Sequence, residues 1–158
     1  MAQILKTATR PDRPLGVWVS PNFTEWHSGS GELRVFVLHT SAEWTRAALA
    51  AVAARTRDLG ARVTLVAVQT VPFPLPLDRP DVAPGFLEQE LKVLAHGIDA
   101  PVDVCVLIAR DREVSVEQAI PPRSMVVFAA KKRWWQTSHQ RLARRLARTG
   151  HSVTLLEV

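Results

Sequence analysis

Two short stretches and one serine hold the side chains that could do chemistry in this sequence. The stretch "HTS" (39–41) and the stretch "KK" (131–132) each follow an apolar run, and Ser138 opens an arginine-rich segment. Hydroxyl groups, lysine ammonium groups and the amides of a helix N-terminus are the donors with which proteins hold phosphates and carboxylates. These residue types therefore predict a site for a small anionic ligand.

A catalytic or metal-binding constellation is not visible in the sequence. Ser41 has no recognisable base partner and lacks the flanking glycines of a nucleophile elbow. His39, His139 and His151 do not have the spacing of a metal site, and no HExxH motif occurs. Cys105, the single cysteine, lies in an apolar run where a buried, inert thiol is expected. The sequence predicts a protein that is not an enzyme and holds no metal.

The C-terminal third of the chain is basic. The net charge is +5, and no acidic residue occurs between Glu117 and Glu157. Trp134 and Trp135 follow "KKR" and could stack on nucleic-acid bases, or they could cover the end of a sheet. In "SHQRLARRLARTG", however, leucines follow one helical face and arginines the other, as in an amphipathic surface helix. The pattern favours a solvated face, and nonspecific nucleic-acid binding is the alternative.

The composition is that of one globular domain. The chain has 158 residues, of which 47% are hydrophobic and 22% are charged. No apolar run reaches the roughly 20 residues that span a bilayer, so no membrane insertion is expected. The first residues lack the long apolar centre of a secretory signal, which predicts a cytoplasmic protein.

Apolar runs typical of buried strands alternate with helical patterns along the chain. Strands are expected at 33–39, 61–68, 101–109, 124–130 and 151–158. Helices are expected between them, beginning at Thr40, Pro84, Arg112 and Thr137. This order predicts an α/β fold: an open five-stranded parallel sheet, doubly wound, with helices on both faces. In the first helix, "TSAE" fits a capping box with Thr40 as the N-cap, Leu59 is expected near the buried face, and Gly60 is expected as the stop.

The first 32 residues differ from the rest, because they contain three prolines and the segment "HSGSG". We therefore divide the chain into an N-terminal extension, residues 1–32, and an α/β domain, residues 33–158. Within the extension, "LGVWVS" (15–20) alternates enough to form a short edge strand.

The fold predicts where a ligand would bind. Open parallel sheets bind ligands beyond the carboxyl ends of their strands, at the point where the strand order reverses. The first and fourth strands are expected to be neighbours there. The "HTS" and "KK" stretches and Ser138 would then face one crevice.

The segment 34–68 and the segment 124–158 resemble the first and last units of the universal stress protein family. That family has a strand, an alanine-rich helix and a strand ending in a valine, the position that Val68 holds here. Nucleotide-binding members have an aspartate where His39 stands, and a glycine-rich phosphate loop where Ala130 replaces the first glycine. The resemblance implies a ligand site formed by His39, Thr40, Ser41, Val68, Ala130, Lys131, Lys132 and Ser138.

The resemblance implies a non-enzymatic regulatory or stress-response domain that does not bind ATP in the usual way and pairs as a homodimer through its last strand. ATP binding through an altered phosphate loop is the second hypothesis. Nonspecific nucleic-acid binding through the basic helix is the third.

Overall fold

The computed structural model describes residues 18–19, 32–77, 80, 82–131 and 138–158, and for residues 18–19 only the backbone. The strands are β1 (Trp18–Val19), β2 (Arg34–Leu38), β3 (Arg62–Thr70), β4 (Val102–Ala109), β5 (Met125–Ala130) and β6 (Ser152–Glu157). The helices are α1 (Ala42–Thr56), α2 (Pro84–His96), α3 (Arg112–Ala119) and α4 (Ser138–Arg148). Each strand and helix predicted for the α/β domain is present, with ends that differ by a few residues.

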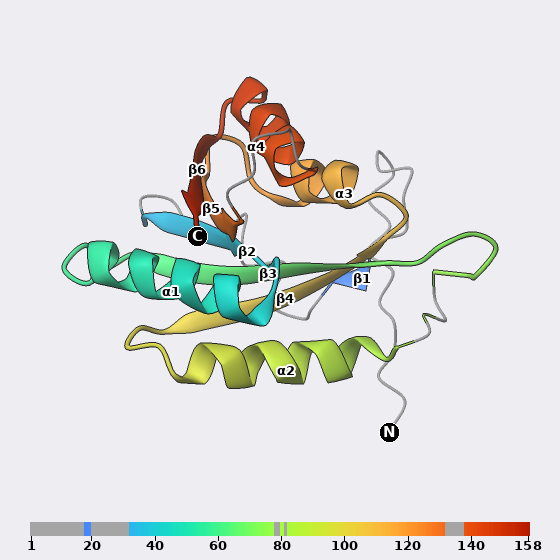
Figure 1. Ribbon diagram of the computed structural model, residues 1–158, viewed down its shortest axis with the longest axis horizontal. Helices are drawn as coiled ribbons and strands as arrows, with labels where there is room; N and C mark the ends of the chain where they lie inside the picture. Colours follow the sequence, from blue (N-terminus) through green and yellow to red (C-terminus); the bar gives the residue numbers. More distant parts are fainter. Residues whose placement is uncertain (1–17, 20–31, 78–79, 81, 132–137) are drawn as a thin grey trace.

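The sheet has the strand order β1-β4-β3-β2-β5-β6 (Figure 1). Strands β2 to β6 are all parallel, and only the two-residue strand β1 pairs antiparallel, against β4. Chain order reverses between β2 and β5, which are hydrogen-bonded neighbours with Val35 opposite Met125. The predicted doubly wound α/β sheet is therefore confirmed, and so is the predicted pairing of the first and fourth domain strands.

Helices cover both faces of the sheet, with α1 and α2 on one side and α3 and α4 on the other (Figure 1). Strand side chains alternate between the faces and build a separate core on each. On the α1/α2 side, Val37 and Leu65 pack with Leu49 and Leu91. On the α3/α4 side, the core contains Phe36, Leu38, Phe128, Leu142 and Leu146, all of them 1% exposed or less.

The start of α1 differs from the capping box expected in the sequence. Ser41, not Thr40, is the N-cap, and its Oγ accepts a hydrogen bond from the Trp44 amide at 3.3 Å. Thr40 lies one residue before the cap, and its hydroxyl donates to the carbonyl oxygen of Ala129, 2.8 Å away in β5. Both residue types are good caps, so the sequence alone does not distinguish them.

The end of α1 also differs from the prediction. The helix stops at Thr56, and Gly60 adopts its positive φ of 61° in the turn that follows the helix. Leu59 lies in that turn, where its amide donates to the Thr56 carbonyl, and it is 62% exposed rather than part of the core. The expectation that Leu59 lies on the buried face was wrong because the helix ends before reaching it.

Strand β1 comes from the N-terminal extension and lies at the edge of the sheet next to β4, with Trp18 opposite Ile108. In the part of the chain that the structure describes, no helix combines the length and apolarity that crossing a bilayer requires.

Candidate functional site

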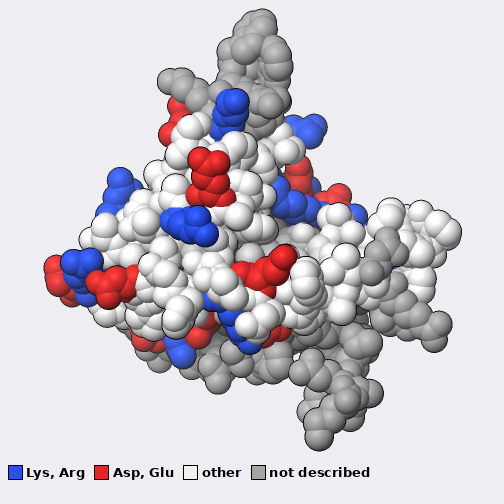
Figure 2. All heavy atoms as spheres, turned by 60° about the horizontal axis from the view of Figure 1, so that its bottom comes forward, with Lys and Arg blue, Asp and Glu red and all other residues white. Residues whose placement is uncertain are grey.

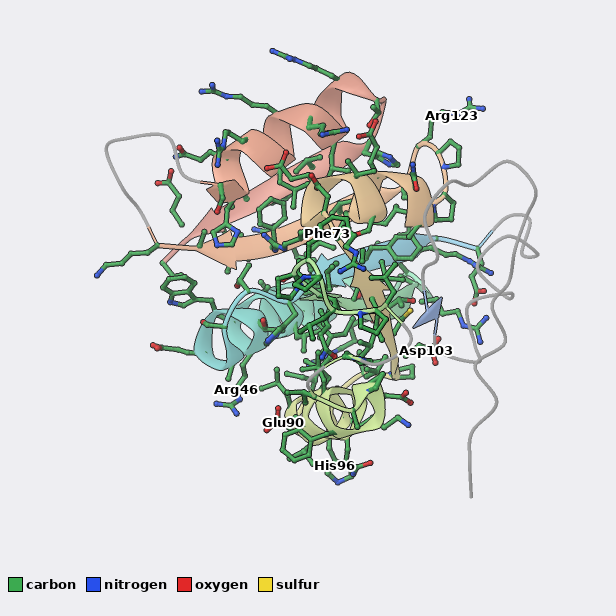
Figure 3. The ribbon with its side chains drawn as sticks, turned by 90° about the vertical axis from the view of Figure 1, so that its right-hand side faces the viewer. Arg46, Phe73, Glu90, His96, Asp103 and Arg123 are labelled. Atoms are coloured by element: carbon green, nitrogen blue, oxygen red, sulfur yellow. The ribbon has the colours of Figure 1, made fainter. Side chains whose placement is uncertain are left out.

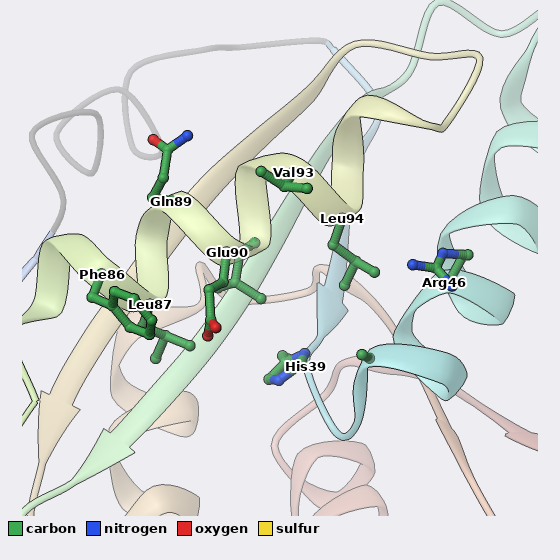
Figure 4. A pocket seen from close by; sticks show the side chains of 10 residues that line it. His39, Arg46, Phe86, Leu87, Gln89, Glu90, Val93 and Leu94 are labelled. Carbon is green, nitrogen blue, oxygen red and sulfur yellow. The ribbon is translucent and has the colours of Figure 1, made fainter.

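A pocket of about 470 Å³ opens between α1 and α2, next to the carboxyl end of β2 (Figure 4). Leu91 and Leu94 of α2 are 2% and 8% exposed, whereas Phe86 and Val93 on the same helix are 61% and 68% exposed. The buried leucines contribute to the inner wall and the exposed side chains to the rim. The lining residues are His39, Ala42, Arg46, Phe86, Leu87, Gln89, Glu90, Leu91, Val93 and Leu94. The pocket is thus mainly apolar, with a few polar groups.

His39 is fixed in the pocket wall by a buried threonine. The hydroxyl of Thr45 lies 2.9 Å from His39 Nδ1 and accepts the amide proton of Thr40 at 3.1 Å. Since the hydroxyl has one proton of its own, we assign that proton to Nδ1, which leaves Nε2–H of His39 as the free donor. Burial, and then the positive charge of Arg112, lower the pKa of His39, so the neutral imidazole dominates at pH 7.

Glu90 and Arg46 are the charged side chains that line the pocket. Both point toward the gap between α1 and α2 (Figure 3), and Glu90 extends from α2 in the direction of His39 (Figure 4). The carboxylate of Glu90 acts on His39 in the opposite sense to burial, because its negative charge raises the imidazole pKa. A carboxylate acceptor, a guanidinium donor and an imidazole donor therefore surround an apolar space.

The residues predicted to share one crevice at the strand-order reversal lie on different faces of the sheet. His39 lines the pocket on the α1/α2 side, whereas Val68 packs against the core on the α3/α4 side. Thr40 connects β2 to β5 by its hydrogen bond to Ala129, next to the buried Ala130. None of these residues except His39 lines the pocket.

The remaining predicted residues are engaged locally or exposed. Ser41 is occupied as the N-cap of α1. Lys131 follows β5 and Ser138 begins α4, and both are exposed. Lys132 lies outside the described residues, as do Trp134 and Trp135.

Arg112, in the first turn of α3, lies on the other side of the β2 end from the pocket. Its Nη2 donates to the carbonyl oxygen of His39 at 3.4 Å, and its Nη1 donates to His139 Nδ1 in α4 at 3.3 Å. Burial lowers the pKa of Arg112, and burial together with the Arg112 charge lowers the pKa of His139. The Arg112 guanidinium therefore connects α3 to the loop after β2 and to α4, and its positive charge is partly buried.

The arginines of α4 are not equivalent. Arg145 forms ion pairs with Glu117 and Glu113 of α3, and the bond to Glu117 raises its pKa. Arg141, Arg144 and Arg148 are exposed. The face of the molecule drawn in Figure 2 shows basic and acidic side chains interspersed rather than a field of one sign.

Sequence reasoning missed Arg46, Glu90, Thr45 and Arg112. A usable signal existed for Arg112, because "RDRE" (110–113) directly follows the carboxyl end of a parallel strand, where ligand-binding residues are concentrated. Thr45 also stands out as a hydroxyl in an alanine-rich helix. Arg46 and Glu90 carried no such signal, because only the packing of α1 beside α2 brings them together.

In comparisons with known proteins, no family model matches the chain, and no curated protein matches it significantly.

Proposed function

We propose that this chain is a non-catalytic regulatory domain, similar to universal stress proteins, that binds a small ligand in the pocket between α1 and α2. The observation that carries the proposal is an apolar pocket of about 470 Å³ at the carboxyl end of β2, with the fixed imidazole of His39 in its wall. Its size lies within the roughly 300–1,000 Å³ typical of small-molecule sites.

The polar groups of the pocket suggest what kind of ligand it takes. His39 Nε2–H and Arg46 are donors, and Glu90 is an acceptor. Leucine, phenylalanine and valine side chains form most of the remaining wall. A ligand with a flat apolar body, one hydrogen-bond acceptor for His39 and one donor for Glu90 would satisfy these groups.

The hydroxyl groups near the pocket favour binding over catalysis. The Ser41 hydroxyl accepts a hydrogen bond from the Trp44 amide, and the Thr40 hydroxyl donates to the Ala129 carbonyl. The Thr45 hydroxyl is hydrogen-bonded to Nδ1 of His39. Among the described residues, Ser41 and Thr40 have no base partner, and Thr45, which is hydrogen-bonded to the His39 imidazole, is 0% exposed and so lies out of reach of a substrate.

The pocket can be tested by filling it. Ala42 lines the pocket from the exposed side of α1, and Ala47 is an exposed alanine of the same helix that does not line it. We expect the fluorescent apolar anion 8-anilinonaphthalene-1-sulfonate to bind the wild type, and Ala42→Trp to weaken binding about tenfold, while Ala47→Trp leaves it unchanged. Equal binding by the two variants would contradict the proposal.

Nucleotide binding through an altered phosphate loop is the second candidate. It is favoured by the strand order, in which β2 and β5 are neighbours at the reversal, as dinucleotide- and mononucleotide-binding sheets have it. The Thr40–Ala129 hydrogen bond counts against it, because it occupies the space between the two strand ends. Purified protein should be denatured, and the molecular masses of the released small molecules should be measured. Stoichiometric adenine nucleotide would replace our first proposal by this one.

A homodimer through β6 belongs to the first proposal. Strand β6 is the last strand of the sheet, and its residues Val153, Thr154, Leu155 and Leu156 are half-buried. An apolar strand at an open edge favours pairing with a second copy. Light scattering should give twice the mass of 17.5 kDa, and a monomer at high concentration would contradict this part of the proposal.

A further inference from the structure

Arg112 is held differently from Arg57, Arg62, Arg110 and Arg145. Arg57, Arg62 and Arg145 each form an ion pair with a carboxylate. Arg110 is fixed by the carbonyl oxygens of Val71 and Pro72, at 2.9 and 3.0 Å. In the part of the chain that the structure describes, no carboxylate lies within ion-pair distance of Arg112, although its side chain is partly buried. A desolvated cation without an anionic partner is unfavourable unless something compensates its charge.

Among the residues that the structure describes, the contacts of Arg112 leave part of its donor capacity unused. A guanidinium carries five N–H donors in a planar fork, and the two hydrogen bonds, to His39 O at 3.4 Å and His139 Nδ1 at 3.3 Å, are both long. Because His139 Nδ1 accepts from Arg112, the proton of the neutral ring is on Nε2, which makes Nε2–H a donor beside the guanidinium.

The acidic residues nearest to Arg112 in the sequence are engaged elsewhere. Asp111 caps α3 by accepting the Val114 amide at 3.0 Å. Glu113 lies 3.8 Å from Arg145, and Glu117 also pairs with Arg145. The negative charge of Glu113 raises the pKa of Arg112 and so offsets part of the effect of burial, and burial together with the Arg112 charge lowers the pKa values of both His39 and His139.

We propose that Arg112, together with His139, binds an oxyanion, a phosphate or carboxylate group, at the carboxyl edge of the sheet on the α3/α4 side. Arg112 offers the guanidinium N–H groups that its two hydrogen bonds to described residues do not use, and His139 offers Nε2–H from the first turn of α4. The amides of that turn add partial positive charge at the same place. This site lies across the end of β2 from the apolar pocket, so it can be present or absent independently of the pocket.

The histidines report on the site directly. Inorganic phosphate should be titrated at low ionic strength while the imidazole proton signals are followed by NMR. Neutralising the Arg112 charge should raise the apparent pKa values of His39 and His139. His151, which lies at the opposite end of the sheet before β6, should not respond.

Matched variants separate a specific site from general charge. Arg112→Gln should lose the phosphate response at least tenfold, and Arg144→Gln, which removes an exposed arginine of α4, should keep it. Arg112→Lys keeps the charge and should weaken binding less than Arg112→Gln, which guards against a variant that fails to fold. Acetate in place of phosphate distinguishes a carboxylate site from a phosphate site, and either response supports the proposal. No response of His39 and His139 to either anion, or equal losses in the Arg112 and Arg144 variants, would overturn it.

Discussion

The hydroxyl of Thr40 donates a hydrogen bond of 2.8 Å to the carbonyl oxygen of Ala129, and so joins β2 to β5 at the point where the strand order reverses. In an open doubly wound sheet the chains leaving two such strands turn to opposite faces, which separates them. Here α1 turns to one face and α4 to the other, and a side chain of the first loop occupies the space between the strand ends.

Replacing this hydroxyl should destabilise the fold. Thr40→Val keeps the shape but leaves the Ala129 carbonyl without its partner, and we expect a loss of about 1–2 kcal/mol in the free energy of unfolding. Thr56→Val is the matched control, because the Thr56 hydroxyl makes only a local bond to the Val52 carbonyl within α1. Urea denaturation should show a clearly smaller loss for the control. Equal losses in the free energy of unfolding would mean that the Thr40–Ala129 hydrogen bond stabilises the fold no more than a local bond within a helix.

Glycine should stabilise the turn before β5. Arg123 is exposed and has a φ of 57°, a left-handed conformation that costs a residue with a Cβ atom about 1–2 kcal/mol (Figure 3). Glycine avoids this cost but loses more entropy on folding, so we expect Arg123→Gly to gain about 0.5–1 kcal/mol. Arg123→Ala removes the same side chain but keeps the Cβ atom. If the alanine variant gained as much in urea denaturation, relief of backbone strain would not be the cause.

Acidification below pH 6.5 should destabilise the protein. Burial lowers the pKa values of His39, His139 and His151 in the folded state below the reference value of 6.5. The unfolded chain therefore binds more protons than the folded one as the pH falls from about 6.5 through the folded pKa values. The stabilisation is complete above about pH 7 and is lost in that window. The free energy of unfolding, measured from pH 7.5 to pH 5, should decrease. The decrease should be smaller in His151→Gln. A free energy of unfolding that stays constant or rises as the pH falls would contradict the prediction.

Nucleic-acid binding should be absent at physiological salt. Arg145 is paired with Glu113 and Glu117, so α4 offers only Arg141, Arg144 and Arg148 as exposed cations. So few phosphate contacts give weak binding that depends steeply on salt. Fluorescence anisotropy with labelled single-stranded DNA should show no binding at ~150 mM salt. Micromolar binding at that salt, abolished in the triple arginine-to-glutamine variant, would restore the nucleic-acid hypothesis.

The fold could be predicted from the sequence because its strands and helices carry strong local signals. Apolar runs such as residues 104–109 are buried on both faces, and Pro84 and Gly97 mark the ends of α2. The sequence does not distinguish Ser41 from Thr40 as the N-cap, because both residue types are good caps, and the bond from Thr40 to Ala129 joins residues far apart in the chain.

The candidate site was only partly accessible to sequence reasoning. His39 was expected at the carboxyl edge and lines the pocket there. Its partner Thr45 and its pocket neighbours Arg46 and Glu90 come from two helices, and their approach depends on how α1 and α2 pack on the sheet. Val68 was expected near His39 but packs on the other face, because strand residues alternate in direction.

The segment between β3 and α2 is hydrogen-bonded to Gln69 of β3 and to Arg110, which directly follows β4. Arg110 holds the carbonyls of Val71 and Pro72 and lies 4.1 Å from the ring centre of Phe73, and Gln69 donates to the Val82 carbonyl at 2.8 Å. Amide hydrogen exchange in α2 should therefore follow that of residues 71–77, as one cooperative unit. A compound that occupies the pocket would slow exchange throughout this unit, so mixtures of unknown metabolites could be screened for ligands before any of them is identified.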